Sequence, residues 1–281
     1  MKSSFKTLLV LLALGFVIGG CRKSSPTAYM RAYSIFYRDP LGSSSWHQFT
    51  MSAVSPNFKP DVKFNGRSIP SENVDVGFGL GDFVGYDTLP TISPNAEVQL
   101  EAKYRDLNEK EKTAKSKVKL PSEPSVSVKI TGDVIRVAWG KPDKKTVSFV
   151  YVGITAYCYD GSKDTTITED TIITDIENVT EFSKTKGTMC VGMSNPIFIY
   201  AYGFVGYFYG PWSGSKDNID GIKGQFYGAT GLADTTSWIL SSSAKFERKP
   251  SLNREEILRR AIKAINERFG ASEEGNWING F

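Results

Sequence analysis

Short runs rich in Tyr, Val, Phe and Ile recur between Thr27 and Leu120, and they constrain the fold more than any other feature of the sequence. Gly, Pro, Asn and Ser separate these runs at intervals of roughly ten residues, the spacing of strands and turns in an antiparallel sandwich. A helix would instead need apolar residues at a period of about 3.6. This part of the chain is therefore predicted to be all-β.

The predicted strands of this first module begin and end near turn residues. They are Tyr29–Phe36, His47–Val54, Asp61–Phe64, Val74–Phe78, Val84–Leu89, Glu97–Tyr104 and Lys115–Leu120. Asn65-Gly66 is the strongest turn signal, because both residues tolerate the positive φ that a tight hairpin needs. We interpret residues 27–120 as one antiparallel β-sandwich that resembles the immunoglobulin fold.

A proline-containing stretch from Leu120 to Ser125 separates this module from a second one, because proline stiffens a linker and ends strand pairing. The following sequence Val137-Ala138-Trp139-Gly140-Lys141-Pro142 resembles the fibronectin type III signature of a strand that ends in a buried tryptophan before a proline. Ile197–Gly203 resembles the F strand of that family, and Gly210–Ser213 its following loop. The resemblance covers residues 121–231 and implies a second antiparallel sandwich.

Two predicted strands of this second module, 149–159 and 197–204, alternate between aliphatic and aromatic side chains. Their aromatic rows include Tyr151, Tyr157, Tyr159, Phe198, Tyr200 and Tyr202. Successive side chains of a strand point to opposite faces. The fibronectin-like register implies that the aliphatic rows point inward and that the two strands are neighbours, so the aromatic rows are expected side by side on the outside.

These outward aromatic rows are the candidate binding surface, because a monomer rarely exposes so large an apolar patch without a use for it. Tyrosine suits contact with a protein or a glycan, since it combines a broad apolar body with a polar tip. The alternative is that the first module, the segment Ser237–Ser251 or the terminal helix covers this face.

The end of the chain changes to a helical period. Asn253 can cap a helix in which Glu256 reaches back to the cap, and Gly270 is a suitable stop, so we expect a linker over 232–252, a helix over 253–270 and a tail over 271–281. Its apolar stripe consists of Ile257, Leu258, Ala261, Ile262, Ile265 and Phe269. A lone helix of this length is marginal in water, so the stripe needs a partner surface, either on this protein or on another.

The first twenty residues have the pattern of a secretory signal peptide, with Lys2 and Lys6 before an apolar run that is too short to span a bilayer. The sequence Ile18-Gly19-Gly20-Cys21 resembles the bacterial lipobox. That resemblance implies cleavage before Cys21, attachment of fatty acyl chains such as palmitate to it, and a tether over 21–26. The alternative is a plain signal peptide with an incidental cysteine. Arg22, in place of the aspartate that retains some lipoproteins at an inner membrane, favours the outer membrane.

Two cysteines remain once Cys21 carries lipid. Cys158 and Cys190 form an even pair in a compartment that permits disulfides. In a fibronectin-like topology the end of one strand lies near the start of the other, and we expect Cα atoms less than about 7 Å apart, within reach of a bridge. Two buried free thiols are the alternative.

Composition and motifs argue against several classes of function. Without Lys2 and Lys6, 32 basic residues face 30 acidic ones, so no basic surplus favours nucleic acid. His47 is the only histidine, and any histidine-based catalytic or metal site would rest on it. The glycines of 77–81 and Ser213 do not match phosphate-loop or nucleophile-elbow spacing, and Asp217–Gly221 lacks the ligand spacing of a calcium loop.

These observations lead us to expect a lipid-anchored protein of the bacterial cell envelope that binds a protein or glycan and is not an enzyme. No cofactor, metal site or nucleic-acid partner is expected. The alternatives are a structural subunit of an envelope assembly and a carbohydrate hydrolase that uses two carboxylates.

Overall fold

The computed structural model describes residues 27–40, 42–74, 80–87, 92–143, 147–159, 164–174, 176–192, 196–209 and 217–240. Within them the chain is all-β, as predicted, and every element is a strand except one short 3-10 helix, η1 (Lys186–Cys190). The predicted signal peptide, tether, terminal helix and tail lie outside the described residues.

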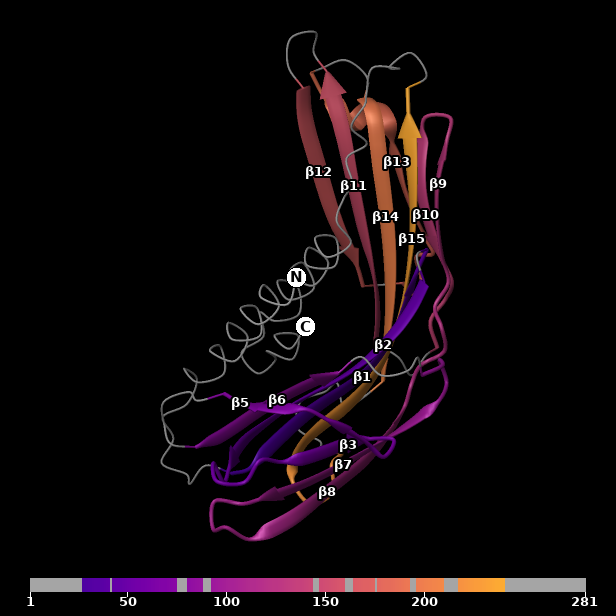
Figure 1. Cartoon of the computed structure of the whole chain (residues 1–281). Coiled ribbons are helices and arrows are strands. Elements are labelled where there is room, and N and C mark those ends of the chain that lie inside the picture. Colours follow the sequence, from indigo (N-terminus) through magenta and orange to yellow (C-terminus); the bar gives the residue numbers. More distant parts are fainter. Residues whose placement is uncertain are drawn as a thin grey trace.

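The strands form three sheets, of which the largest has eight strands in the order β12-β11-β14-β15-β1-β2-β6-β5. Figure 1 shows this sheet running along the length of the molecule. Its strands are β1 (Tyr29–Asp39), β2 (Gly42–Val54), β5 (Ser71–Asn73), β6 (Gly81–Asp87), β11 (Val147–Tyr159), β12 (Asp164–Ile173), β14 (Pro196–Tyr209) and β15 (Lys223–Ile239).

The two smaller sheets pack near opposite ends of this long sheet (Figure 1). One has the order β4-β3-β7-β8 and the other the order β13-β10-β9. Their strands are β3 (Asp61–Phe64), β4 (Arg67–Ile69), β7 (Glu97–Arg105), β8 (Glu111–Lys119), β9 (Val126–Thr131), β10 (Val134–Trp139) and β13 (Glu181–Thr185).

Both small sheets lie on the same face of the long sheet. Even-numbered residues of β15 meet both of them: Phe226 belongs to the core with β3, β7 and β8, and the Asp234 carboxylate accepts a hydrogen bond from the Val128 amide of β9 at 2.8 Å. The molecule therefore has two apolar cores end to end on one side of one sheet, and the opposite face of the sheet is turned away from both.

β15 joins the two halves that the sequence separates at residues 120 and 121. It pairs antiparallel with β14 of the second half and parallel with β1 of the first half. The expected arrangement of two separate sandwiches is therefore corrected to two cores that share a continuous sheet.

The predicted linker over 232–252 is also corrected, because residues 232–239 are the second half of β15. This segment is rich in Thr and Ser and has no simple apolar alternation, so it does not read as a strand. It becomes one because its backbone has partners on one side along its whole length in β14, and because Asp234 satisfies a backbone amide of the neighbouring sheet.

Turn signals in the sequence predict the structure correctly where neighbouring residues alone determine the backbone conformation. Asn65 and Gly66 have φ values of 48° and 80° and connect β3 to β4 as predicted, and β3 has the predicted bounds Asp61–Phe64. The strand predicted at Val74–Phe78 falls largely outside the described residues, and β5 ends just before it. Within the described residues, no helix is long and apolar enough to cross a membrane.

Candidate functional site

The aliphatic and aromatic rows of β11 and β14 face opposite sides of the long sheet, as the alternation predicts. Val152, Ile154 and Ile199 belong to the core beneath β9 and β10, whereas Tyr151 and Tyr202 belong to a cluster on the other face. The two strands are neighbours, with Tyr157 opposite Phe198. The predicted rows therefore do lie side by side.

The rows are part of a larger surface that extends across β1 and β15, which we call the aromatic face. It consists of Tyr33, Tyr37, Phe149, Tyr151, Tyr157, Phe198, Tyr200, Tyr202, Phe204, Phe208 and Tyr227. The alternation in the sequence predicts only the part of this face on β11 and β14. The other tyrosines lie alongside because β1 pairs in parallel with β15, and no local sequence pattern predicts that pairing.

Ring contacts run along the whole aromatic face. The centroid separations are 5.7 Å for Tyr157 and Phe198, 6.1 Å for Tyr151 and Tyr202, 5.9 Å for Tyr37 and Phe204, 5.5 Å for Phe149 and Phe208, and 5.3 Å for Tyr33 and Tyr227. These separations fall in the range at which aromatic pairs attract each other beyond their simple burial.

Glycines beneath the aromatic face let some of these rings lie flat on the sheet. A Cβ at Gly206 would lie 2.8 Å from the Phe149 ring, and one at Gly231 would lie 2.7 Å from the Phe204 ring. Both distances are shorter than a carbon–carbon contact allows, so a side chain there would lift the ring off the backbone.

The six predicted site residues differ in burial: three are almost fully buried, two are half-buried and one is exposed. Tyr151 is 1% exposed, Tyr202 4% and Phe198 5%, whereas Tyr159 at the end of β11 is 42% exposed. Tyr157 and Tyr200 are half-buried. The alternative of an open aromatic surface is therefore corrected for Tyr151, Phe198 and Tyr202, and their burial agrees with the covered alternative that the sequence also leaves open.

The phenols on this face are held in a dry environment. Burial raises the pKa of Tyr202 well above its ordinary range, and it raises the pKa of Tyr227 to about 12 although the nearby Arg31 guanidinium acts in the opposite direction. The Tyr151 hydroxyl donates a hydrogen bond to the Asp170 carboxylate of β12 at 2.8 Å. The raised pKa values keep the Tyr202 and Tyr227 phenols neutral at physiological pH, so these two rings present apolar surface and hydroxyl groups without charge.

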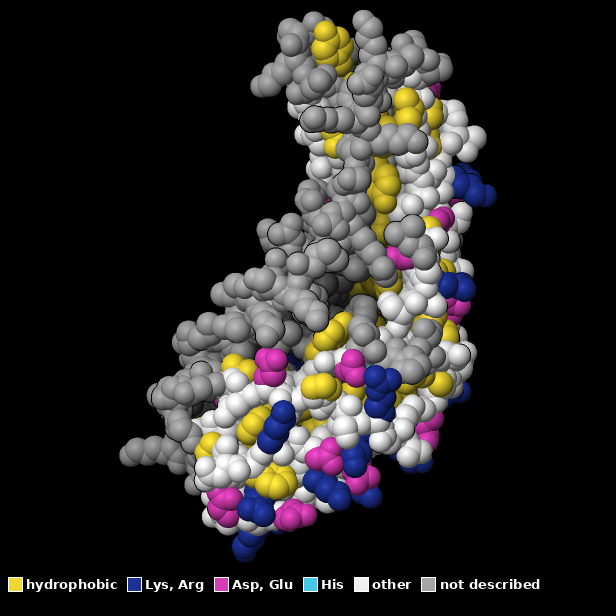
Figure 2. All heavy atoms as spheres, in the orientation of Figure 1, with side chains coloured by type: hydrophobic (Ala, Val, Ile, Leu, Met, Phe, Trp, Pro, Cys, Tyr) yellow, Lys and Arg dark blue, Asp and Glu magenta, His cyan; other side chains and the backbone are white. Residues whose placement is uncertain are grey.

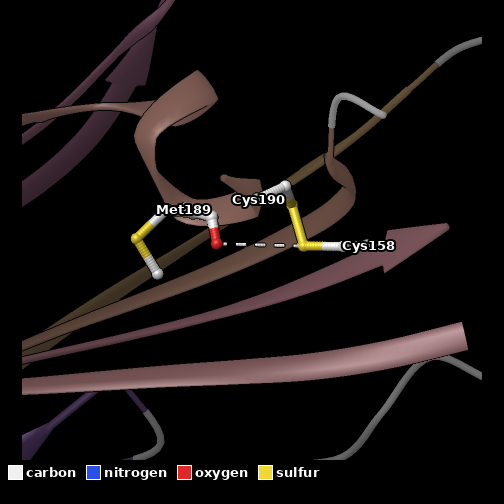
Figure 3. The surroundings of a disulfide bond; sticks show 3 residues. All are labelled: Cys158, Met189 and Cys190. Carbon is white, nitrogen blue, oxygen red and sulfur yellow. Dashed lines mark hydrogen bonds between the residues drawn. A yellow bond between two sulfur atoms is a disulfide. The ribbon is translucent and has the colours of Figure 1, made fainter. Parts of the chain in front are cut away.

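Cys158 and Cys190 are joined in a disulfide bond at one end of the long sheet (Figure 3). Their Cα atoms are 5.8 Å apart, below the expected 7 Å limit. The bond ties η1 to the end of β11, and the Cys158 Sγ lies 4.0 Å from the Met189 carbonyl oxygen. In η1, the Lys186 ammonium lies 3.6 Å from the centre of the Trp238 ring of β15, so helix and sheet are held together at two points.

Ser34, His47 and Asp87 lie on adjacent strands in direct register, an arrangement that combines the residue types of a catalytic triad. His47 is fully buried against Phe64, and burial lowers its pKa to about 4. Among the described residues, neither ring nitrogen of His47 nor the Ser34 hydroxyl has a hydrogen-bond partner. The nucleophile-to-base hydrogen bond that a triad requires is therefore missing, and no solvent reaches the imidazole.

A polar groove with a volume of about 460 Å³ lies on the outer side of β3, β7 and β8. Three lysines line or border it, and each is paired: Lys63 with Asp61 at 3.2 Å, Lys115 with Glu101 at 3.8 Å and Lys117 with Glu97 at 3.1 Å. Figure 2 shows charged side chains of both signs mixed over this end of the molecule. Because the charges balance, the groove does not favour an anion or a cation.

The faint calcium-loop sequence at 217–221 has a structural role in the turn before β15. The Asp217 carboxylate accepts a hydrogen bond from the Gly224 amide at 2.8 Å, and the Asn218 side chain bonds both the amide and the carbonyl of Phe226. Within the described part of the chain, no group of three histidine, cysteine or acidic residues is placed to hold a metal ion.

No family model matches the chain, and no curated protein matches it either.

Proposed function

We propose that this chain is a non-enzymatic, lipid-anchored protein of the bacterial cell envelope that binds a protein partner through the aromatic face. The observation that carries this proposal is the gathering of phenyl and phenol rings from β1, β11, β14 and β15 on the one face of the long sheet that neither small sheet covers. Rings that neither small sheet covers stay out of water only when another apolar surface packs on them, and we take this to be the role of a protein partner.

The burial of the rings favours an apolar protein segment over a glycan as the partner. A sugar stacks on a ring whose flat side is accessible, whereas Tyr151 and Tyr202 are almost fully buried. A helix or strand with an apolar face can instead pack on such a dry surface, in place of the segment that covers it.

The proposed anchor is Cys21, and the position of β1 is consistent with it. Tyr29, the first residue of β1, follows Cys21 by eight residues and lies opposite Lys223, at the end of β15 that is remote from the disulfide. Sixteen further residues of β15 at about 3.3 Å each carry the sheet roughly 53 Å away from that point. The sheet is therefore long enough for the disulfide end of the aromatic face to lie far from the anchored end of the chain. Arg22 favours the outer membrane.

The finer fold assignment also stands as a proposal. We propose that residues 121–231 resemble a fibronectin type III module and that residues 27–120 resemble an immunoglobulin-like one. The neighbouring positions of β11 and β14 support the first, because strands C and F of that family are neighbours. Trp139, 5% exposed, supports it as well, since the family buries this tryptophan.

Site-specific photo-crosslinking in intact cells tests the binding proposal. A photoreactive phenylalanine at position 200, on the aromatic face, should cross-link to a second polypeptide. The same residue at position 117, on the outer side of β8, should give far less. Equal or absent cross-linking at the two positions would overturn the proposal. Cys21→Ser in the same cells should move the protein out of the detergent phase, and unchanged partitioning would overturn the anchor.

A further inference from the structure

The aromatic face is buried more deeply than its own sheet explains. Its two clusters contain only side chains from one face of the eight-stranded sheet, whereas the other two clusters combine that sheet with a small one. A ring that lies on an uncovered sheet keeps one side in contact with water. Tyr151 is only 1% exposed and Tyr202 only 4%, so another segment must lie over these rings.

Among the described residues, no strand supplies that cover. The contacts of β9 and β8 with the long sheet are made on the opposite face, where Gly203 and Gly228 meet valine side chains of the small sheets. The longest part of the chain outside the described residues follows Leu240 and comprises the 41 residues 241–281.

We propose that residues 253–270 of the same chain occupy the aromatic face. The apolar stripe that the sequence predicts for this segment, with Leu258, Ile262 and Phe269 among its members, offers the aliphatic and aromatic surface that a dry ring face can bury. A segment of this length forms a stable helix only when such a stripe is packed, so the face would stabilise the helix as the helix covers the face.

The chain leaves β15 at a point from which residues 253–270 can reach the aromatic face. The Leu240 amide donates to the Ile197 carbonyl at 2.9 Å, so the chain leaves β15 beside the first residues of β14, at one end of the aromatic face. Twelve residues, 241–252, can span up to about 40 Å. A helix of 18 residues is about 27 Å long, and the stretch of β14 from Phe198 to Phe208 is about 33 Å long, so the segment fits along the face.

This inference rests on the proposed function in one respect: a partner that binds the aromatic face would have to displace residues 253–270. Occupancy itself does not depend on whether a partner exists.

Radical footprinting of the full chain tests the occupancy. Leu258→Ser with Ile262→Ser removes two stripe residues, and Arg259→Ser with Lys263→Ser makes the same changes at the same spacing on the polar side of the predicted helix. The stripe variant should increase oxidation of Tyr151 and Tyr202 at least threefold, and the control variant should leave it unchanged. Equal oxidation in the two variants would overturn the proposal.

Cross-linking in the otherwise unchanged chain keeps the test independent of folding defects. A photoreactive phenylalanine at position 269, on the stripe, should cross-link within the monomer to peptides of β1, β14 or β15, and the same residue at position 267 should not. Products with the mass of a dimer would assign the face to a second copy and overturn the proposal, as would products on the small sheets. Failure of position 200 to capture a second polypeptide would overturn the proposed function alone.

Discussion

At the scale of single residues, His47 is the most unusual side chain in the described structure. It lies in the core between β2 and β3, with its ring centroid 4.8 Å from that of Phe64, and neither ring nitrogen has a hydrogen-bond partner in the described part of the chain. Burial lowers its pKa to about 4, and the Asp87 carboxylate only partly opposes this shift. The folded protein therefore holds His47 neutral at a pH where an unfolded chain would protonate it.

We predict that acid destabilises the fold through His47. The unfolded chain binds a proton at this residue below its ordinary pKa of about 6.5, whereas the folded protein does so only near 4, so stability is present above pH 6.5 and is lost as the pH falls toward 4. At about 1.4 kcal/mol for each pKa unit, the loss amounts to about 3 kcal/mol.

Urea unfolding of the parent and of His47→Phe at pH 7, 5.5 and 4.5 measures this effect. Phenylalanine has a similar volume and does not titrate, so the free energy of unfolding should fall less steeply with pH in the variant. If the two pH profiles run parallel, His47 is protonated without penalty and the assignment is wrong.

At the scale of elements, β14 contributes Tyr200 and Tyr202 to the aromatic face. We predict that Tyr200→Ser combined with Tyr202→Ser lowers the free energy of unfolding by several kcal/mol, because the second ring is almost fully buried and large-to-small changes in such places cost about 3–5 kcal/mol. The thermal midpoint should fall by more than about 10 °C.

Tyr159→Ser is the matched comparison for that pair, since the ring at the end of β11 is 42% exposed. Its midpoint should move by no more than about 2 °C. A double variant as stable as Tyr159→Ser would show that the rings are bare in solution, and the aromatic face would then be an open surface.

The rows of β11 and β14 show what a sequence can and cannot predict. Their facing follows from a period of two, which is a local property of any strand, and it is confirmed. Their burial depends on what lies over the sheet, and that is set by contacts far away in the chain. Tyrosine suits both a buried and an exposed position, so the residue type does not decide between them.

The second half of β15 is predicted to be a linker for a related reason. Its first half has apolar residues such as Phe226, but its second half reads Ala233-Asp234-Thr235-Thr236-Ser237, which resembles a linker. The strand is specified by its neighbours, because β14 accompanies it to Ile239 and β1 joins it in parallel as far as Leu232. Parallel pairing between the first and last strands of the described chain leaves no local pattern.

At the scale of the whole molecule, the shared sheet determines how the two halves behave together. Leu100 lies in the core of β3, β7 and β8, and Ile154 lies in the core of β9 and β10, and the two cores have no buried residue in common. Each nevertheless packs against β15, which is hydrogen-bonded to both halves. Unfolding one half would leave β15 unpaired along one edge and strip one of its faces.

We therefore predict a single cooperative unfolding transition in calorimetry of the disulfide-bonded protein. Leu100→Ala and Ile154→Ala should each cost about 2–5 kcal/mol, and because both cores unfold together, each change should lower the same midpoint. Two independent sandwiches joined by a linker behave differently, since each would melt separately and each substitution would move only its own transition. Two resolved transitions, with Leu100→Ala shifting one and Ile154→Ala the other, would show that the pairing of β1 with β15 does not couple the halves.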